Sequence, residues 1–237
     1  MAVTAAAVAN PTRTEIISSD KLILLWADMK VEQQMVGMMG VCCYILSCET
    51  TAKAAIVDPG GDEQRILDRV IEAGLDVEYI IATHGHPDHV CGNRRIKEAT
   101  GAAIIMHEDD DDFFSQSQVK NYFSMLGMEE SPATDVRVKE GDLITFGEVS
   151  LQVIHTPGHT PGGMCLYTNP DLITGDTLFV GGIGRTDFPG GSHRDLISSI
   201  QEKLLVLPPE TVVWPGHGYG GSRSTIEEER RSNPYLR

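Results

Sequence analysis

The stretch Thr83-His84-Gly85-His86-Pro87-Asp88-His89 gathers three histidines and one aspartate within six residues. Imidazole nitrogens and carboxylate oxygens are the usual ligands of a catalytic zinc ion. Gly85 and Pro87 are turn residues, so the backbone can fold tightly and direct the four side chains toward one point. A histidine-rich surface turn is the alternative, but it does not explain these ligand types at this spacing after an apolar segment. The stretch therefore predicts a metal-binding turn.

Three further metal-ligand residues, His159, Asp176 and His217, occur later in the chain in similar local settings. Each follows a short apolar segment directly or within a few residues, and each adjoins a glycine. Separate strand ends can converge on one edge of a sheet, so these side chains can meet the first turn. Together they fit two metal ions that share a bridging carboxylate. The seven candidate ligands are His84, His86, Asp88, His89, His159, Asp176 and His217.

The elements that must position these side chains are short apolar strands. Residues 77–82 read as a buried strand before the first turn, and residues 90–100 begin a helical pattern after it. The first turn thus leaves the carboxyl end of a strand, where open α/β sheets place their ligands. Residues 150–155 and 211–214 are the strands predicted to deliver His159 and His217.

Three other segments give predictions about packing. A helix is predicted after Asp62, and Asp62 is its predicted N-cap. The apolar positions at helical spacing are Ile66, Leu67, Val70 and Ile71. Cys42 and Cys43 lie in a predicted strand and should point to opposite faces. Residues 33–40 hold three methionines and two glycines, which either fill gaps in the core or form an apolar flap over a binding site.

A run of five acids at residues 108–112 is interpreted as a solvated helix start, since carboxylates suit a helix N-terminus. A cation site is the less favoured alternative. The aromatic residues Phe113, Phe114, Tyr122 and Phe123 follow closely and are consistent with a short helical lid. Cys91 lies two residues after the metal-binding turn. We interpret it as a packing residue, and the alternative is a group that contacts the metal ligands from outside.

The composition restricts the class of protein. The chain has 237 residues with 41% hydrophobic content, which favours one domain over residues 21–237 after a flexible tail at residues 1–20. A net charge of −15 disfavours nucleic acid as a partner, and no apolar run approaches the roughly 18 residues that span a membrane. Five cysteines without regular spacing predict a reducing, cytoplasmic setting.

Four motifs in this order resemble the metallo-β-lactamase-fold hydrolases: Thr-His-Gly-His-Pro-Asp-His, Thr-Pro-Gly-His-Thr-Pro-Gly, Thr-Gly-Asp-Thr-Leu-Phe and Pro-Gly-His-Gly. The resemblance runs from about Lys21 to the C-terminus, and Asp58 matches the usual aspartate after an early strand. The loop at residues 184–191 and the tail at residues 225–236 are similar to those of short members of the glyoxalase II group, the hydroxyacylglutathione hydrolases. Their full-length relatives add a C-terminal helical domain that helps bind glutathione, whereas 20 residues follow His217 here, so the thiol carrier stays open.

The resemblance implies an α/β fold of the αββα four-layer sandwich type, and two divalent metal ions, first of all zinc, with iron or manganese as alternatives. By motif position, Asp176 would bridge the two ions, and Asp58 would orient the ligand turn from outside it. The first ion would be held by His84, His86 and His159, and the second by Asp88, His89 and His217.

The expected function is hydrolysis of a small-molecule thioester, such as a hydroxyacylglutathione, by a metal-bound hydroxide that Asp88 helps to orient. A monomer or a homodimer is expected. The first alternative is a persulfide dioxygenase, with one iron on His84, His159 and Asp176. Further alternatives are a phosphodiesterase or nuclease, which the net charge disfavours, and a non-catalytic binding protein of the same fold.

Arg185 is the candidate substrate-binding residue, because it lies nine residues after Asp176 in a glycine-rich loop. Its planar guanidinium suits a substrate carboxylate. The alternative is an ion pair with Asp187 that holds the loop in shape.

Overall fold

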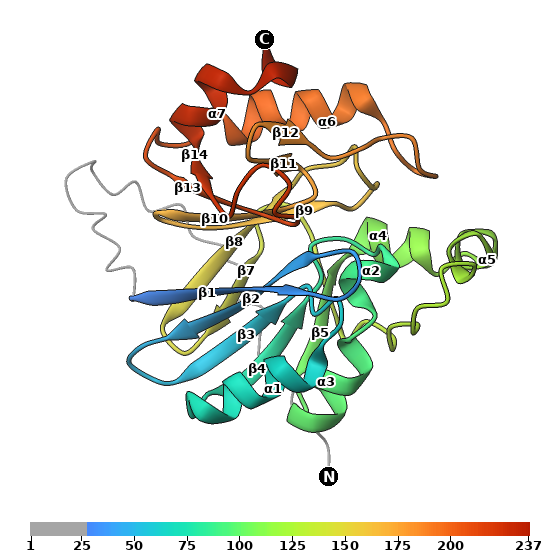
Figure 1. Ribbon diagram of the computed structural model, residues 1–237, viewed down its shortest axis with the longest axis vertical. Coiled ribbons are helices and arrows are strands. Elements are labelled where there is room, and N and C mark those ends of the chain that lie inside the picture. Colours follow the sequence, from blue (N-terminus) through green and yellow to red (C-terminus); the bar gives the residue numbers. More distant parts are fainter. Residues whose placement is uncertain (1–27) are drawn as a thin grey trace, which may run out of the picture.

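The computed structural model describes residues 28–237 and shows two mixed β-sheets packed face to face with helices on their outer sides (Figure 1). The predicted αββα sandwich is therefore confirmed. The predicted tail at residues 1–20 lies outside the described residues. So does the apolar segment at residues 21–26, for which the sequence predicts a strand. Within the described range, no helix has the length and apolarity needed to cross a membrane.

Within residues 28–237, the first sheet has six strands in sequential order, with antiparallel pairing from β1 to β3 and parallel pairing from β3 to β6. Because neighbouring strands from β3 to β5 are parallel, their carboxyl ends meet at one edge of the sheet. The strands are β1 (Met29–Val36), β2 (Val41–Cys48), β3 (Lys53–Val57), β4 (Asp76–Ile81), β5 (Ala103–His107) and β6 (Val136–Val138).

The second sheet has the order β14-β13-β10-β9-β8-β7 and is antiparallel except where β10 pairs with β13. A small hairpin of β11 (Leu178–Phe179) and β12 (Gly182–Ile183) follows β10. The strands of this sheet in the described part of the chain are β7 (Leu143–Phe146), β8 (Val149–His155), β9 (Met164–Thr168), β10 (Asp171–Gly175), β13 (Val212–Pro215) and β14 (Ser224–Thr225).

Helices cover the outer face of each sheet. On the first sheet, α1 (Glu63–Glu72) and α3 (Asn93–Thr100) pack through Ile66 and Ile96 against strand residues such as Ile80. On the second sheet the covering elements are α6 (His193–Ser199), a π-helical turn (Ile200–Leu204) and α7 (Ile226–Ser232), and a 3-10 turn (Pro234–Leu236) closes the chain. Three short helices, α2 (Pro87–Val90), α4 (Glu108–Phe114) and α5 (Ser117–Ser124), lie together at one side of the sandwich (Figure 1).

Cys42 and Cys43 point to opposite faces of the first sheet, as predicted. Cys42 belongs to the core between the two sheets, where it joins Phe146 and Leu166. Cys43 belongs to the core beneath α1 and α3, with Ile66. The first sheet is therefore buried on both faces, which explains why β2 reads as a continuous apolar run.

The helix predicted over residues 90–100 is divided into α2 and α3 by Cys91 and Gly92. The Gly92 backbone N–H donates to the carbonyl oxygen of Pro59 over 2.8 Å. A Cβ atom at position 92 would lie 2.2 Å from that oxygen, so the approach requires glycine. This tertiary contact, which the helical pattern does not encode, explains the break.

Asp62 stands at the N-cap of α1 but makes no capping hydrogen bond with its side chain. Its carboxylate instead accepts a hydrogen bond from the backbone N–H of Gly37, over 3.1 Å. Ile71, expected to pack, is 74% exposed, because it lies off the face of α1 that buries Ile66, Leu67 and Val70. The helix is therefore correct in position, but the predicted cap and one predicted core residue are wrong.

The methionine-rich segment forms the tip of the hairpin between β1 and β2. Met35, Met38 and Met39 are 62%, 92% and 53% exposed, so the core-filling interpretation is wrong. The tip lies beside the end of β13, since a Cβ atom at Gly218 would stand 3.6 Å from the Met35 sulfur. Its position next to His217 agrees with the alternative interpretation, an apolar flap.

Candidate metal centre

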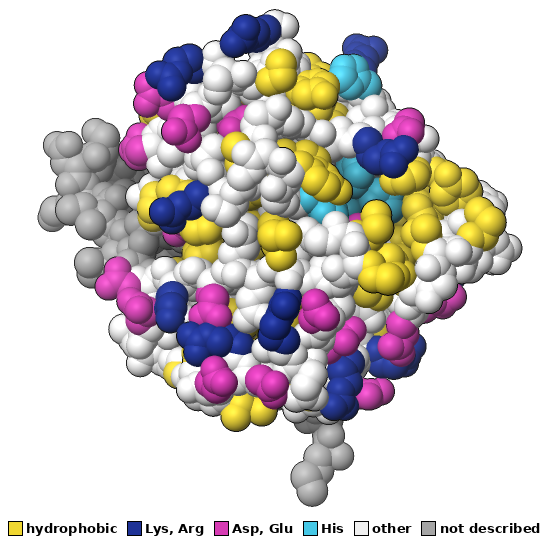
Figure 2. Space-filling view, viewed as in Figure 1, with side chains coloured by type: hydrophobic (Ala, Val, Ile, Leu, Met, Phe, Trp, Pro, Cys, Tyr) yellow, Lys and Arg dark blue, Asp and Glu magenta, His cyan; other side chains and the backbone are white. Residues whose placement is uncertain are grey.

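All seven candidate ligands meet where strands of both sheets end. His84 to His89 follow β4, His159 follows β8, and Asp176 and His217 follow β10 and β13. Figure 2 shows histidine side chains at the bottom of a hollow that is bordered by hydrophobic side chains. The sandwich thus brings together turns from distant parts of the chain, as the shared strand-end setting predicted.

The first cluster consists of His84, His86 and His159, which are 2%, 4% and 3% exposed. Nδ1 of His86 lies 2.9 Å from Nε2 of His159. One ligand atom from each of the three residues lies within 4.8 Å of the others. Three buried imidazoles at this spacing form a half-shell of nitrogen ligands that suits a divalent cation.

The second cluster consists of Asp88, His89 and His217. The Nε2 atoms of the two histidines are 3.2 Å apart, and Oδ2 of Asp88 lies 3.6 Å from Nε2 of His217. Both histidines are buried, whereas the Asp88 side chain is 18% exposed. This cluster offers two nitrogens and one carboxylate, the ligand types of a second divalent cation.

Asp176 lies between the two clusters. Its Oδ2 is 3.5 Å from Nε2 of His159 and 3.6 Å from Nε2 of His217, and its Oδ1 is 3.5 Å from Nε2 of His89. One carboxylate therefore faces ligand nitrogens of both clusters. This is the position that a bridging ligand requires.

Outer contacts orient the ligand imidazoles. Asp58 accepts hydrogen bonds from the backbone N–H of Thr83 at 2.8 Å, from the Thr83 hydroxyl at 2.6 Å, and from Nδ1 of His89 at 3.0 Å. Because the Thr83 hydroxyl donates to Asp58, it accepts from Nδ1 of His84, which lies 3.1 Å away. These contacts hold the Nδ1 side of the His84 and His89 rings. The Nε2 atom of each ring therefore faces the other ligands of its own cluster.

Buried atoms without partners provide a test of whether a metal fits. Nε2 of His84 and Oδ1 of Asp176 are buried and have no hydrogen-bond partner among the described residues. Such groups are costly unless something satisfies them. A cation between these atoms would do so, and the donor set of nitrogen and carboxylate oxygen suits zinc, iron and manganese. The clusters are therefore suited to a dinuclear metal site.

Electrostatics separate the histidines into two groups. Burial, together with the neighbouring histidines, lowers the pKa of His84 and His86 well below its usual range, so both rings are neutral at pH 7. Burial opposes protonation of His89, but the carboxylates of Asp176, Asp88 and Asp58 outweigh it and raise its pKa to about 10. A cation in the second cluster would therefore have to displace a proton from His89.

Aromatic side chains pack against one histidine of each cluster. The ring of His86 lies 5.5 Å from that of Phe114, 5.1 Å from that of Phe123 and 5.5 Å from that of Phe188, between centroids. In the second cluster, the ring of Tyr219 stacks on that of His217, 4.9 Å away between centroids. Phe188 and Tyr219 were not singled out from the sequence; their signal is that each stands in or directly after a glycine-rich motif that carries or borders a ligand.

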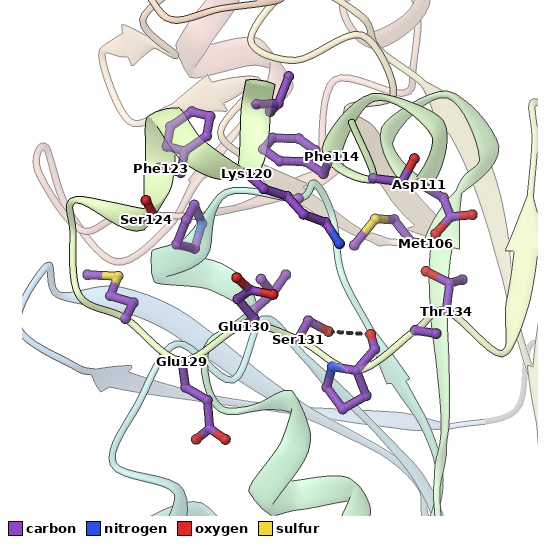
Figure 3. Close-up of a pocket in the computed structure, with 18 residues that line it drawn as sticks. Met106, Asp111, Phe114, Lys120, Phe123, Ser124, Glu129, Glu130, Ser131 and Thr134 are labelled. Atoms are coloured by element: carbon purple, nitrogen blue, oxygen red, sulfur yellow. Dashed lines mark hydrogen bonds between the residues drawn. The ribbon is translucent and has the colours of Figure 1, made fainter. Parts of the chain in front are cut away.

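A cavity of about 290 Å³ lies on the far side of the Phe114 and Phe123 rings, beneath α5 (Figure 3). Its walls are mostly apolar and include Met106, and Lys120 extends across it. Helices α4 and α5 and their aromatic residues thus form a cover beside the metal turn, in agreement with the expected helical lid.

The guanidinium of Arg185 is paired with a carboxylate of its own loop. Its Nε and Nη2 atoms bind the two carboxylate oxygens of Asp187 at 2.7 and 2.6 Å. The guanidinium also lies over the ring of Phe188, 3.9 Å from the centroid. Of the two interpretations, this geometry matches the ion pair that shapes the loop.

Cys91 is half-buried, and burial, with the charges of Glu63 and Asp88 adding to it, raises the pKa of its thiol to about 11. Its sulfur lies 4.0 Å from the carbonyl oxygen of Asp88. A neutral thiol in this place packs against the ligand turn, as expected, and is a poor nucleophile.

The fold and the paired clusters define an αββα protein whose His and Asp clusters are suited to a dinuclear metal site. A model of the metallo-beta-lactamase superfamily matches residues 37–217. The chain is 38% identical to the hydroxyacylglutathione hydrolase GloC of Haemophilus influenzae, over 77% of this chain and 87% of that protein. It is 32% identical to the mitochondrial persulfide dioxygenase ETHE1 of Mus musculus, over 81% of this chain and 70% of that protein.

Among solved structures, that of TTHA1623 in a di-iron-bound form is similar, with a TM-score of 0.76, 31% identity, and coverage of 87% of this chain and 100% of that one. The chain belongs to the metallo-β-lactamase superfamily, whose members are generally metal-dependent hydrolases.

Proposed function

We propose that this protein is a metal-dependent hydrolase that cleaves a thioester such as a hydroxyacylglutathione. The observation that carries the proposal is the position of Asp176 between two complete ligand clusters. Both clusters are needed for a dinuclear hydrolytic centre, and each retains its three ligands.

Each cluster would hold one ion, and Asp176 would bind both. The first ion would be held by His84, His86 and His159, and the second by Asp88, His89 and His217. When bound, the ions supply Lewis acidity and lower the pKa of a coordinated water to about 7. The side chains of Asp88 and Asp176 are 18% and 11% exposed, while the ligand histidines of both clusters are nearly closed to solvent. Water and substrate would therefore approach over the carboxylates, where Asp88 can accept a hydrogen bond from the attacking water.

Thioesters suit this arrangement because a thiolate leaves readily without a strong general acid. The similarity to GloC supports the thioester class, and the aromatic rings of Phe123, Phe188 and Tyr219 beside the clusters offer apolar contact for an acyl or thiol group. The net charge of −15 opposes the binding of polyanionic phosphodiesters.

A persulfide dioxygenase is the second candidate, favoured by the similarity to ETHE1. Two histidines and one carboxylate, here His84, His159 and Asp176, match the ligand set of a non-haem iron site. Such a site leaves Asp88, His89 and His217 without a metal to bind. The complete second cluster is thus the observation that favours the hydrolase.

Metal analysis and paired assays test the proposal. The protein is purified without added metal, analysed for zinc, iron and manganese, and then assayed with a hydroxyacylglutathione and with a nitrophenyl phosphodiester. We expect two ions per chain and faster release of thiol than of nitrophenol. In Asp88→Ala, which removes a ligand of the second cluster, we expect loss of the second ion and of thiol release. One iron per chain with oxygen consumption on a glutathione persulfide would favour the dioxygenase, and faster nitrophenol release would favour the phosphodiesterase.

A further inference from the structure

Asp110 is a buried carboxylate inside an acidic run whose other members are exposed or partly exposed. Its exposed fraction is 0%, whereas the side chains of Asp109 and Asp112 are 52% and 67% exposed. Helix α4 does begin with the acidic run, as predicted, but the solvated interpretation is wrong for this residue. A buried charge is costly unless it is paired or fully hydrogen-bonded, so its partners are informative.

Three donors satisfy the Asp110 carboxylate. Its Oδ2 accepts from the backbone N–H of Gly85 at 2.8 Å and from the Thr160 hydroxyl at 2.9 Å. Its Oδ1 accepts from the backbone N–H of Gly162 at 2.6 Å. Within residues 28–237 no Lys, Arg or His forms an ion pair with Asp110. The carboxylate is therefore held by hydrogen bonds alone.

The three donors belong to two different ligand turns. Gly85 lies between His84 and His86, while Thr160 directly follows His159. One side chain from α4 thus connects the turn after β4 with the turn after β8. Together these two turns carry all three residues of the first cluster.

Helix α4 fits closely against both turns. A Cβ atom at Gly162 would lie 2.2 Å from the backbone nitrogen of Asp110, and one at Gly85 would lie 2.2 Å from the Phe114 ring. Neither glycine leaves room for a side chain, so both turns lie in close contact with α4. The short Asp110 side chain therefore sets the separation of the turns.

We propose that Asp110 is a positioning residue that holds the turn of His84 and His86 against the turn of His159, and so sets the metal affinity of the three-histidine cluster. The proposal rests on the metal-binding part of the proposed function and does not depend on the substrate. The proposal predicts that a substitution at Asp110 lowers the metal affinity of one cluster only. Substitution of a residue that only stabilises the fold would lower the metal affinity of both clusters alike.

Asp110→Asn is the direct test, because it keeps the size but places an NH₂ group opposite at least one donor. It is combined with His217→Ala, which leaves the three-histidine cluster as the main zinc site, and separately with His86→Ala, which leaves the other cluster. Zinc affinity is measured on the full chain by competition with a chromogenic chelator. We expect Asp110→Asn to weaken zinc binding about 10–100-fold in the His217→Ala background and to leave it unchanged in the His86→Ala background.

Asp112→Asn is the matched control, since it makes the same change at an exposed position of the same helix and should alter neither affinity. If Asp110→Asn does not fold, Thr160→Val removes one of the three donors, and Thr160→Ser, which retains the hydroxyl, should restore the affinity. Equal affinities of the Asp110→Asn and parent proteins in the His217→Ala background, or equal losses in both backgrounds, would overturn the proposal.

The two proposals fail separately. Two zinc sites with an Asp110-dependent first cluster, but no thioester hydrolysis, would refute the proposed function and leave the role of Asp110 intact. Thioester hydrolysis by a protein whose zinc affinity does not change in Asp110→Asn would refute the role of Asp110 and leave the proposed function intact.

Discussion

The imidazole of His159 donates a hydrogen bond from Nδ1 to the backbone carbonyl oxygen of Arg185, over 2.7 Å. The donor must be the ring, since a carbonyl oxygen can only accept. The glycine-rich loop therefore orients a ligand of the first cluster through its backbone, while the Arg185 side chain is engaged with Asp187. This separates the function of the loop from the function of the guanidinium.

Arg185→Ala should lower activity on a carboxylate-bearing and on a neutral thioester by the same factor. The reason is that the guanidinium already binds a carboxylate within its own loop. The pair is exposed and screened by solvent, so its loss should lower the melting temperature only slightly. Asp187→Asn, which breaks the same pair, is the matched control. A loss confined to the charged thioester would instead identify Arg185 as a substrate clamp.

Asp176→Ala should reduce metal occupancy at both clusters, because one carboxylate faces nitrogens of each. The measurement is metal content after reconstitution with excess zinc and removal of loosely bound ions. Asp176→Asn, which keeps the shape but weakens the ligand, should give an intermediate occupancy. The dinuclear reading would be wrong if the wild-type protein itself, reconstituted with excess zinc or iron, held a single ion.

Asp58→Asn should weaken metal binding by about 10–100-fold, the usual cost of losing an outer-shell partner. An amide in place of the carboxylate would present NH₂ toward the Thr83 hydroxyl or His89, both of which donate to Asp58 now. The effect should be greatest in the His89 cluster. Asp62→Asn, at an exposed aspartate four residues further on, serves as the control and should leave zinc affinity unchanged.

The strands and the ligand turns could be predicted because their signals are local. The apolar runs before His84, His159 and His217 specify strands, and the adjoining glycines specify turns. Asp110 could not be predicted in this way, because its partners Gly85 and Gly162 lie 25 and 52 residues away in the chain. An acidic run shows that a helix begins there, but only packing decides which of its carboxylates faces inward.

The same limit applies to the methionine-rich segment and to Gly92. Exposed methionines and core methionines have the same sequence pattern, and the exposure of Met38 follows from the length of a hairpin that extends past the sheet. The break at Gly92 depends on a contact with Pro59, which is distant in sequence. In each case the deciding contact is non-local.

His107 lies at the N-cap of α4, where its Nδ1 accepts from the backbone N–H of Asp109 over 3.2 Å. Its ring is 2% exposed and stacks on His155 at 4.0 Å between centroids. Burial and the neighbouring His155 lower the pKa of His107 to about 4, against about 6.5 for a free histidine. The folded protein therefore favours the neutral ring.

The sign of this shift predicts how stability changes with acid. Because the folded-state pKa is below the unfolded-state value, the contribution of His107 is fully present above about pH 6.5 and is lost as the pH falls through about 4. His107→Asn removes the titration but keeps a side-chain acceptor that suits an N-cap. In urea denaturation of the chelator-treated protein, wild type should lose stability relative to His107→Asn between pH 6.5 and 4, by up to about 3 kcal/mol at about 1.4 kcal/mol per pKa unit. The exposed His193→Asn should follow wild type throughout, and parallel curves for wild type and His107→Asn would show that the buried ring does not titrate as the structure requires.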